Sequence, residues 1–311
     1  MTTERYAIGI DLGGTNLKIG TVGETGLTAF RQTSLRERTV DEVMNLVERE
    51  ARSFAQQTTG TCVGVGFGVP GIVDVKQGVL VRAPNLPGWQ DVAVQQLLAE
   101  KLQQRVEVDN DANFAALGEA SFGAGRDIPN FVMLTLGTGI GGGIILNGKV
   151  WHGDRGFAGE VGHTVIEIDG ATCTCGGRGC WDEYGASRAF RYLVPKLSPD
   201  GQKVFRQWAG VESVTPEDIA KLADRGDAIA LKLWQMYGRV LGIGIHNLIN
   251  VLGVTTFVIG GGIAAAFNHF VEAARSEVAS RSYPANTQGL KILKATLGPQ
   301  AGVIGAGYKL L

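Results

Sequence analysis

The sequence has no hydrophobic run long enough to cross a membrane and almost no net charge. A membrane-spanning helix needs about 18 or more consecutive apolar residues, and no stretch of the 311 residues reaches that length. The 29 basic and 30 acidic side chains leave a formal charge of −1, which creates no long-range attraction to nucleic acid or anionic lipid. We therefore expect neither nucleic acid nor a membrane among the partners of this protein.

Cysteine is also scarce, and no targeting segment is visible. The N-terminus lacks a basic stretch followed by an apolar one, and an apolar run begins by Tyr6. Of the four cysteines, three lie between Cys173 and Cys180. Such clustering is typical of a metal site in a reducing compartment rather than of a disulfide scaffold. We expect a cytoplasmic protein whose remaining cysteine, Cys62, is a small buried hydrophobe.

The clustered cysteines combine with a histidine to predict a zinc site. The four candidate ligands are His163, Cys173, Cys175 and Cys180, because thiolates and imidazole hold Zn²⁺ tetrahedrally. Glycines between the last two cysteines allow the chain to turn tightly enough for both thiolates to face one ion. A disulfide or three idle thiols are the alternatives. Four protein ligands leave no open position, so the expected zinc is structural.

Glycine, by contrast, is abundant: it occupies 46 of the 311 positions, roughly twice the average share of ~7%. The glycines cluster in turns after apolar runs, which favours close approach of the backbone to ligands. The first such turn, residues 11–16, lies between strands expected at residues 6–10 and 17–22. It is not a P-loop, which needs a following helix and a Gly-Lys-Ser/Thr ending. Its free N–H groups still suit phosphate, and Asp11 suits Mg²⁺; a plain hairpin is the alternative.

A second strand–turn–strand unit follows about 125 residues after the first. Residues 131–136 and 144–146 predict strands around a glycine turn at residues 137–143, and Asn147-Gly148 predicts a tight hairpin. Three glycines of this turn match the spacing of a dinucleotide fingerprint, which we reject because no helix follows. The repeated unit indicates two hairpins that would grip a triphosphate from two sides of a cleft.

A third glycine turn, residues 260–262, follows a strand expected at residues 255–259 and precedes a helix expected from residue 263. A glycine turn at a helix N-terminus suits a nucleotide, and a tight turn packed on the sheet is the alternative. The residues predicted to bind the nucleotide in the three turns are Asp11, Gly13, Gly14, Thr15, Asn16, Thr138, Gly139, Gly141, Gly142, Gly261 and Gly262.

Two carboxylates, Asp109 and Asp111, follow a strand expected at residues 106–108 and precede a helix expected at residues 114–121. Open α/β sheets place their chemistry at the carboxyl ends of strands. From the residues alone, either aspartate is a candidate general base, and either is a candidate helix cap.

Hydrophobic spacing predicts the remaining elements. Asp91 is expected to cap a helix that reaches about residue 104, and Thr215 to cap another. One long helix is expected to break near Gly242 and Gly244. The other expected helices are residues 40–57, 187–197, 216–225, 228–251, 267–281 and 301–311, and the other expected strands are residues 62–69 and 291–295. A chain of this length predicts two domains, although no linker separates them.

Seven motifs together resemble the ROK family, which groups repressors, open reading frames and sugar kinases. In chain order they are D-L-G-G-T-N, G-V-P-G, D-N-D-A-N, L-G-T-G-I-G-G-G, E-V-G-H, C-T-C-G-G-R-G-C and I-G-G-G. The resemblance covers essentially the whole chain and is strongest to ATP-dependent bacterial glucokinases. It implies the α/β class and an actin/hexokinase-like (ribonuclease H-like) fold of two lobes around a central cleft. We assign residues 1–112 and 297–311 to a small lobe, and residues 113–296 to a larger lobe that carries the zinc.

The resemblance also implies roles for single residues. Asp111 matches the catalytic base, and His163 serves both the sugar and the zinc. The family has glutamate two positions after the last cysteine, where this chain has Asp182; we read a one-residue insertion and assign that sugar contact to Glu183. Zinc would brace the backbone that presents Glu160 and Glu183. The residues expected to contact the sugar are Gly71, Asn85, Asn110, Asp111, Glu160, His163 and Glu183.

The implied reaction is ATP-dependent phosphorylation of the 6-hydroxyl of a hexose, with ATP, Mg²⁺ and structural Zn²⁺ bound by a homodimer or homotetramer. We favour glucose, because residues 85–89 resemble the corresponding loop of glucokinases. The alternatives are N-acetylmannosamine, N-acetylglucosamine, fructose, mannose or allose as acceptor, polyphosphate as donor, and a non-catalytic sugar-sensing relic. Repressors of the family carry a DNA-binding helix-turn-helix ahead of this region, whereas the first phosphate strand here begins near residue 6, which favours an enzyme.

Overall fold

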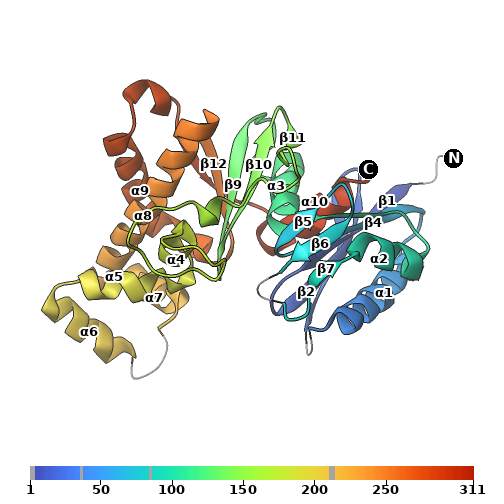
Figure 1. Ribbon diagram of the computed structural model, residues 1–311, viewed down its shortest axis with the longest axis horizontal. Helices are drawn as coiled ribbons and strands as arrows, with labels where there is room; N and C mark the ends of the chain where they lie inside the picture. The colour runs from blue at the N-terminus through green and yellow to red at the C-terminus, as the bar shows by residue number, and fades with distance from the viewer. Residues whose placement is uncertain (1–3, 36–37, 84–85, 210–213) are drawn as a thin grey trace. The chain divides into compact units, whose positions relative to one another are not determined.

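The computed structural model describes residues 4–35, 38–83, 86–209 and 214–311, and the chain forms two compact units (Figure 1). Unit 1 comprises residues 1–133, 142–159 and 295–311, and unit 2 comprises residues 134–141 and 160–294. Residues 113–133, 142–159 and 295–296, which the sequence placed in the larger lobe, group with unit 1. Glu119 connects the first of these segments to the C-terminal part of unit 1, because it is completely buried and accepts hydrogen bonds from the N–H groups of Thr296 and Leu297 at 2.8–3.2 Å.

Five strands form the central sheet of unit 1 in the order β3-β2-β1-β4-β8: β1 (Arg5–Leu12), β2 (Asn16–Gly23), β3 (Gly26–Ser34), β4 (Thr61–Val69) and β8 (Val106–Asn110). The first three strands are antiparallel, and β1, β4 and β8 run parallel. The expected strand–turn–strand unit at the N-terminus is therefore confirmed. Cys62 in β4 is only partly buried against the core.

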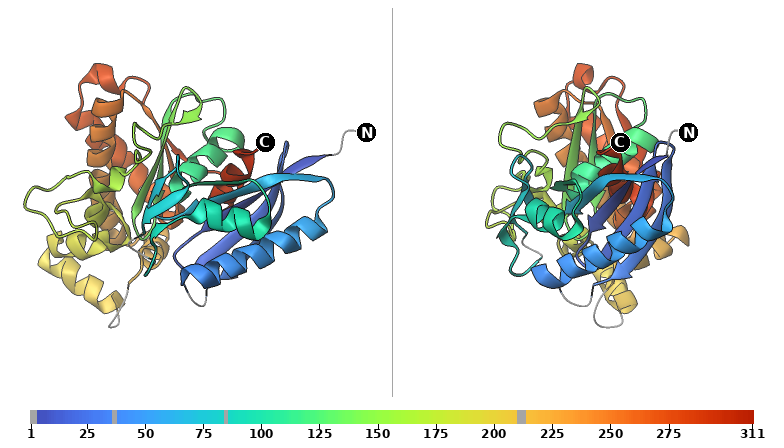
Figure 2. Two further views of the ribbon diagram at one scale, coloured as in Figure 1. Left: turned by 45° about the vertical axis from the view of Figure 1, so that its right-hand side comes forward. Right: turned by 90° about the vertical axis from the view of Figure 1, so that its right-hand side faces the viewer.

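Helices cover both faces of this sheet. They are α1 (Val40–Gln57), α2 (Val94–Leu102), α3 (Asp111–Phe122) and α10 (Ala301–Tyr308), the last preceded by the 3₁₀ turn η6 (Gly298–Gln300). The first two lie on one face and α10 on the other (Figure 2). Glycine permits the close approach of α10, because a Cβ at Gly9 would lie 1.9 Å from the Val303 carbonyl oxygen and one at Gly66 would lie 2.0 Å from that of Ala306.

A smaller antiparallel sheet in unit 1 consists of β5 (Ile72–Asp74), β6 (Val79–Arg82) and β7 (Gln90–Val92). The expected capping role of Asp91 is wrong. Pairing with β6 draws Asp91 into β7, where its φ is 52°. Helix α2 instead begins after Ala93, whose side chain makes no capping hydrogen bond. Tertiary strand pairing thus overrides a local helix-start signal.

The second sheet has the order β11-β10-β9-β12-β13, and the division between the units runs through β9 and β10. Its strands are β9 (Phe131–Leu136), β10 (Ile140–Leu146), β11 (Lys149–Val150), β12 (Thr256–Gly260) and β13 (Lys291–Lys294). Asn147 and Gly148 have φ angles of 52° and 73°, which confirms the tight hairpin predicted from their sequence.

Unit 2 holds the remaining helices. They are α4 (Trp181–Gly185), α5 (Phe190–Leu193), α6 (Pro199–Ala209), α7 (Pro216–Asp224), α8 (Ala228–Leu252) and α9 (Phe267–Arg281). The 3₁₀ turns are η1 (Val161–His163), η2 (Ser187–Ala189), η3 (Val194–Lys196), η4 (Gly262–Ala266) and η5 (Pro284–Thr287). Thr215 caps α7 as predicted, within a capping box with Asp218.

The structure of unit 2 differs from the sequence-based prediction at three places. Residues 187–197 do not form one helix, because Pro195 cannot donate a backbone hydrogen bond and disfavours helix at the residue before it. Helix α6 was not predicted. Helix α8 does not break at its glycines, since these allow close packing: a Cβ at Gly242 would lie 2.7 Å from the Ala274 carbonyl oxygen, and one at Gly244 would lie 2.1 Å from the ring of Trp181. None of the helices in the described part of the chain combines the length and the apolar composition that a membrane crossing requires.

Candidate functional site

The carboxyl edge of the unit 1 sheet gathers several predicted site residues. Asp11 pairs in register with Gly68, and Gly68 pairs with Asp109 on the next strand. Neighbouring strands lie about 4.8 Å apart, so the two aspartates are separated by roughly 10 Å along one row. Asp111 follows at the first position of α3. The predicted phosphate turn and the predicted base therefore occupy the same edge, where open α/β sheets bind ligands.

The turn between β1 and β2 is closed by its own backbone. The Gly13 N–H donates to the Asn16 carbonyl at 2.8 Å. The space beside Gly14 is open, since a Cβ built on this residue would meet no other atom within 4 Å. Asp11 is 8% exposed and forms a 2.7 Å ion pair with Lys18 on β2. Sequence reasoning missed Lys18, although the register of a hairpin that closes at this turn places the two residues opposite each other.

The junction between β8 and α3 is organised by Asn110. Its side-chain oxygen caps α3 by accepting the Ala112 N–H at 2.8 Å, and its amide donates to the Gly71 carbonyl at 2.9 Å. Gly71 has φ of 107°, and a Cβ there would lie 2.3 Å from the Arg82 carbonyl oxygen. The helix begins at Asp111 rather than at residue 114, because Asn110 supplies the cap. Asp111 accepts the same Ala112 N–H at 2.9 Å.

Asp109, the second candidate base, has structural partners on both carboxylate oxygens. Its Oδ1 accepts hydrogen bonds from the Asn110 N–H and the Asn113 side-chain amide, both at 2.8 Å. Its Oδ2 lies 2.7 Å from Nε2 of His152, and Asp109 is 3% exposed. Sequence reasoning missed His152, which carries no motif of its own. These bonds give Asp109 a structural role at the junction between β8 and α3.

In unit 2, the predicted zinc ligands lie together. One donor atom each of His163, Cys173, Cys175 and Cys180 lies within 4.8 Å of the others, and the cysteines are free thiols. With Zn–S bonds of about 2.3 Å and Zn–N bonds of about 2.0–2.1 Å, a tetrahedron has S–S edges of about 3.8 Å and S–N edges of about 3.6 Å. The Cys175–Cys180 sulfurs lie 3.7 Å apart, and Cys173 Sγ lies 3.6 Å from His163 Nδ1. The donor set fits a closed tetrahedral zinc site.

The backbone around these ligands is held tightly. The Cys173 N–H donates to the Gly177 carbonyl at 2.8 Å, and Val165 forms a bridge with Cys180. Gly179 has φ of 70°, and a Cβ there would lie 1.7 Å from the Glu167 carbonyl oxygen. Only glycine therefore fits at this position, which lies directly before a ligand.

Carboxylates border the metal cluster. His163 Nε2 lies 3.7 Å from Glu160, which leaves Nδ1 for the cluster. Desolvation raises the pKa of Glu160, while His163 lowers it and the nearby Asp182 raises it further. Asp182 and Glu183 follow Cys180 in α4, and both are buried. Both are ion-paired with Arg188, the Glu183 oxygen at 3.0 Å.

The turn between β9 and β10 is held by this same acidic segment. Asp182 accepts the Ile140 N–H, and Arg188 donates to the Thr138 carbonyl at 3.3 Å. The Ser187 N–H donates to the Gly137 carbonyl at 2.8 Å. A Cβ at residue 139 would lie 2.9 Å from the Asp182 carboxylate. Sequence reasoning missed Arg188, and these contacts tie Asp182 to the glycine turn.

The other predicted residues are less closely grouped. Gly141 and Gly142 lie within β10. Gly261 has φ of 82°, and a Cβ there would lie 2.3 Å from the Leu136 carbonyl oxygen, so this turn packs tightly on β9. Gly262 begins η4, and a Cβ there would meet nothing within 4 Å. Asn85 falls outside the described residues.

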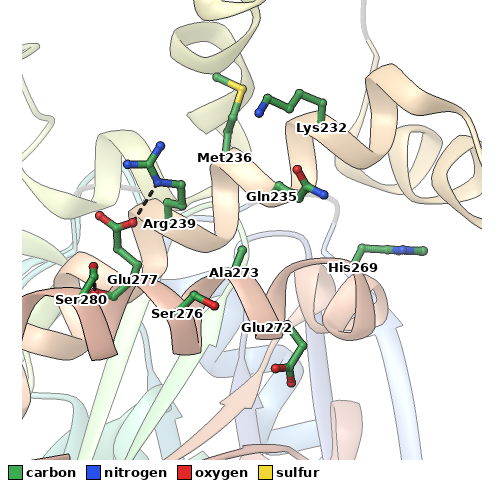
Figure 3. Close-up of a pocket in the computed structure, with 10 residues that line it drawn as sticks. All are labelled: Lys232, Gln235, Met236, Arg239, His269, Glu272, Ala273, Ser276, Glu277 and Ser280. Carbon is green, nitrogen blue, oxygen red and sulfur yellow. Dashed lines mark hydrogen bonds and ion pairs between the residues drawn. The ribbon is translucent and has the colours of Figure 1, made fainter. Parts of the chain in front are cut away.

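A groove between α8 and α9 contains none of the predicted site residues (Figure 3). Its lining includes Lys232, Arg239, His269 and Glu277. Burial raises the pKa of Glu277, but hydrogen bonds from Arg239 and Arg281 outweigh that effect and hold it below the usual range. The groove is thus lined by charges that are largely paired within the protein.

Comparison with known proteins now links these features to a family. The sequence profile of the ROK family matches residues 7–310. A glucokinase of Halalkalibacterium halodurans is 33% identical and covers 98% of this chain and 95% of its own length. A xylose repressor of Caldicellulosiruptor bescii is also 33% identical and covers 96% of this chain and 76% of its own length.

Solved structures show the same likeness. A ROK family glucokinase from Streptomyces griseus, in complex with glucose and AMPPNP, matches with a TM-score of 0.82 at 29% identity over 98% of both chains. A ROK hexokinase from Thermus thermophilus matches with a TM-score of 0.78, also at 29% identity and over 98% of both chains. The expected actin/hexokinase-like fold is confirmed.

Proposed function

The chain belongs to the ROK family, and on that premise we propose that it transfers the terminal phosphoryl group of ATP to the 6-hydroxyl of a hexose, with glucose as the favoured acceptor. The observation that carries this proposal is the row of residues at the carboxyl edge of the unit 1 sheet. It places a glycine turn, in which the space beside Gly14 is open, at the same edge as an aspartate at the start of α3.

In the proposed reaction, Asp111 accepts the proton of the sugar hydroxyl as its oxygen attacks the γ-phosphorus. A new P–O bond forms while the bond to the ADP oxygen breaks. A general base typically contributes ~10²–10⁴-fold, and positioning with charge neutralisation supplies most of the rest. The Lys18 ammonium pairs with the Asp11 carboxylate and neutralises its charge. Mg²⁺, when bound with the nucleotide, would neutralise phosphate charge, and Asp11 is its proposed carboxylate partner.

The sugar is proposed to contact Asn110, Glu160, His163 and Glu183, in addition to Asp111. His163 presents its Nδ1 to the metal cluster, so its Nε2 edge, near Glu160, is the one available for a hydroxyl. We propose that zinc is structural, because its four protein ligands fill a tetrahedron. A reducing compartment is the proposed setting, since the thiols must stay reduced to hold the metal.

A sugar-sensing role without catalysis is the second candidate. The specific observation in its favour is that a xylose repressor is as similar to this chain as a glucokinase is. Within the kinase proposal, N-acetylmannosamine, N-acetylglucosamine, fructose, mannose and allose compete with glucose, and polyphosphate competes with ATP. A homodimer or homotetramer is proposed, and light scattering of the purified protein would measure it.

The deciding experiment measures sugar-dependent ADP release across these hexoses and xylose, with calorimetric sugar binding in parallel. We expect release with glucose at the highest kcat/KM. Asp111→Asn should retain sugar binding and lose ~10²–10⁴-fold in kcat. Binding of a sugar without ADP release from any donor would favour the sensor. Near-normal turnover by Asp111→Asn would remove this residue from the role of base.

A further inference from the structure

Asp109 connects three parts of unit 1 through its buried carboxylate. One oxygen accepts the Asn110 N–H and the Asn113 amide, both at 2.8 Å. Among the described residues, the hydrogen-bond partner of the other oxygen is His152, at 2.7 Å. The imidazole must donate from Nε2 here, because a carboxylate only accepts. The carboxylate is 4% exposed and the imidazole 22%, so water competes weakly for this bond.

His152 also begins the segment that leads to Glu160. The Ala158 N–H donates to the His152 carbonyl at 3.1 Å and closes residues 152–158 into a loop. The Lys76 ammonium donates to the Asp154 carbonyl at 3.1 Å. At the far end of the loop, a Cβ at Gly159 would lie 3.7 Å from the side-chain oxygen of Asn113. The loop is therefore anchored at its start to Asp109 at the end of β8, and Gly159, which follows the loop, lies beside Asn113 in the first turn of α3.

We propose that His152 is a positioning residue for the phosphoryl transfer, an inference that rests on the proposed function. Its bond to Asp109 holds the β8–α3 junction that carries Asn110 and Asp111. The same bond anchors the start of the segment of residues 152–159, which Glu160 follows. One interaction thus orients the proposed base and the backbone that leads to a proposed sugar contact. Removing the donor leaves a buried carboxylate oxygen without a partner, and the junction must shift to satisfy it.

The test compares His152→Phe, which keeps a ring but removes the donor, with His152→Gln, whose side-chain amide can still donate. The matched control is His269→Phe, because His269 forms the same kind of pair with Asp224, also at 2.7 Å, in unit 2. Displacing a reacting group by about 1 Å costs on the order of 10²-fold. We expect kcat to fall by about 10–100-fold in His152→Phe, to recover substantially in His152→Gln, and to stay unchanged in His269→Phe.

Deuterium exchange at residues 110–113 separates this inference from the proposed function. His152→Phe should accelerate exchange at these residues relative to wild type and to His152→Gln. We expect the two variants to have equal melting temperatures. If wild type releases no ADP with any sugar, the proposed function fails, and the exchange result alone decides whether His152 holds the junction. Equal exchange and equal kcat in His152→Phe and His152→Gln would overturn the inference. Loss of kcat in His269→Phe matching that in His152→Phe would also overturn it.

Discussion

The two glycine turns of this protein differ in what holds them. The turn between β1 and β2 is closed by a backbone bond from Gly13 to Asn16 and by the pair of Asp11 with Lys18. All of these residues lie within eight positions of one another. The turn between β9 and β10 also has a local backbone bond, from Gly137 to Gly139. It is held in addition by α4 and the residues after it, which come 42 to 50 positions later in the chain.

The difference has a physical consequence for the proposed metal. Helix α4 begins directly after Cys180, so the second turn is supported by a segment that starts at a metal ligand. The first turn belongs to unit 1 and the metal ligands to unit 2, and its supports are local. Loss of zinc should therefore loosen the second turn and leave the first intact. Four sets of variants test this contrast, in order of decreasing effect.

Cys175→Ser should have the largest effect. Cys175 is exposed, so the substitution removes a metal ligand without opening the core. We expect loss of zinc and a fall in Tm of about 6–12 °C, equivalent to ~3 kcal/mol. Zinc content and calorimetry measure these changes, and deuterium exchange should rise at residues 137–140 but not at residues 13–16. Cys62→Ser is the control and should keep its metal. A zinc-free wild type, or equal loosening of both turns, would contradict the contrast.

Asp182→Ala should be next. It removes the acceptor of the Ile140 N–H and one of the two carboxylates paired with Arg188, at a cost of about 2–4 kcal/mol. Glu183→Ala leaves the bond to Ile140 in place, so we expect its main effect in the KM for sugar. Denaturant unfolding and steady-state kinetics compare the two variants. If Asp182→Ala raises the sugar KM while the turn stays protected, the sugar contact belongs to Asp182 and the assignment to Glu183 is wrong.

Lys18→Met should destabilise the protein by a smaller amount, about 1–3 kcal/mol, because the mostly buried Asp11 loses its charged partner. Urea unfolding measures this, and Asp11→Asn/Lys18→Met shows whether the two losses share one interaction. The effect should stay within the first turn, with zinc content and exchange at residues 137–140 unchanged. Increased exchange at the second turn would show that the two turns are not independent.

Gly14→Ala should have the smallest effect on stability, within about 0.5 kcal/mol, because a Cβ there has open space. The nucleotide KM should still rise, since the added methyl group would stand where phosphate is proposed to approach. Gly139→Ala is the counterpart in the second turn, where the Cβ would press on Asp182 at a cost of about 1–3 kcal/mol. Thermal unfolding with and without nucleotide separates the two effects. An unchanged nucleotide KM in Gly14→Ala would remove this turn from the proposed phosphate site.

Much of the fold was predictable because its signals are local. Helix α1 has the predicted limits, set by Thr39 at one end and by apolar spacing along its length. The hairpin at Asn147-Gly148 follows from two residues that readily adopt positive φ. The zinc cluster was predictable because three of its ligands lie within eight positions. The errors arose where distant partners decided the outcome, as when pairing with β6 drew Asp91 into a strand.

By itself, the sequence determined the local geometry of this protein: the glycine turns, the strands beside them, the capped helices and the set of metal-binding side chains. These depend on the conformations that a few adjacent residues can adopt. Only the tertiary structure decided which groups pair across long stretches of chain, such as His152 with Asp109 and the Asp182 carboxylate with the Ile140 N–H. Residues of these types form such pairs only when packing brings them together and excludes water, and no spacing in the sequence specifies that encounter.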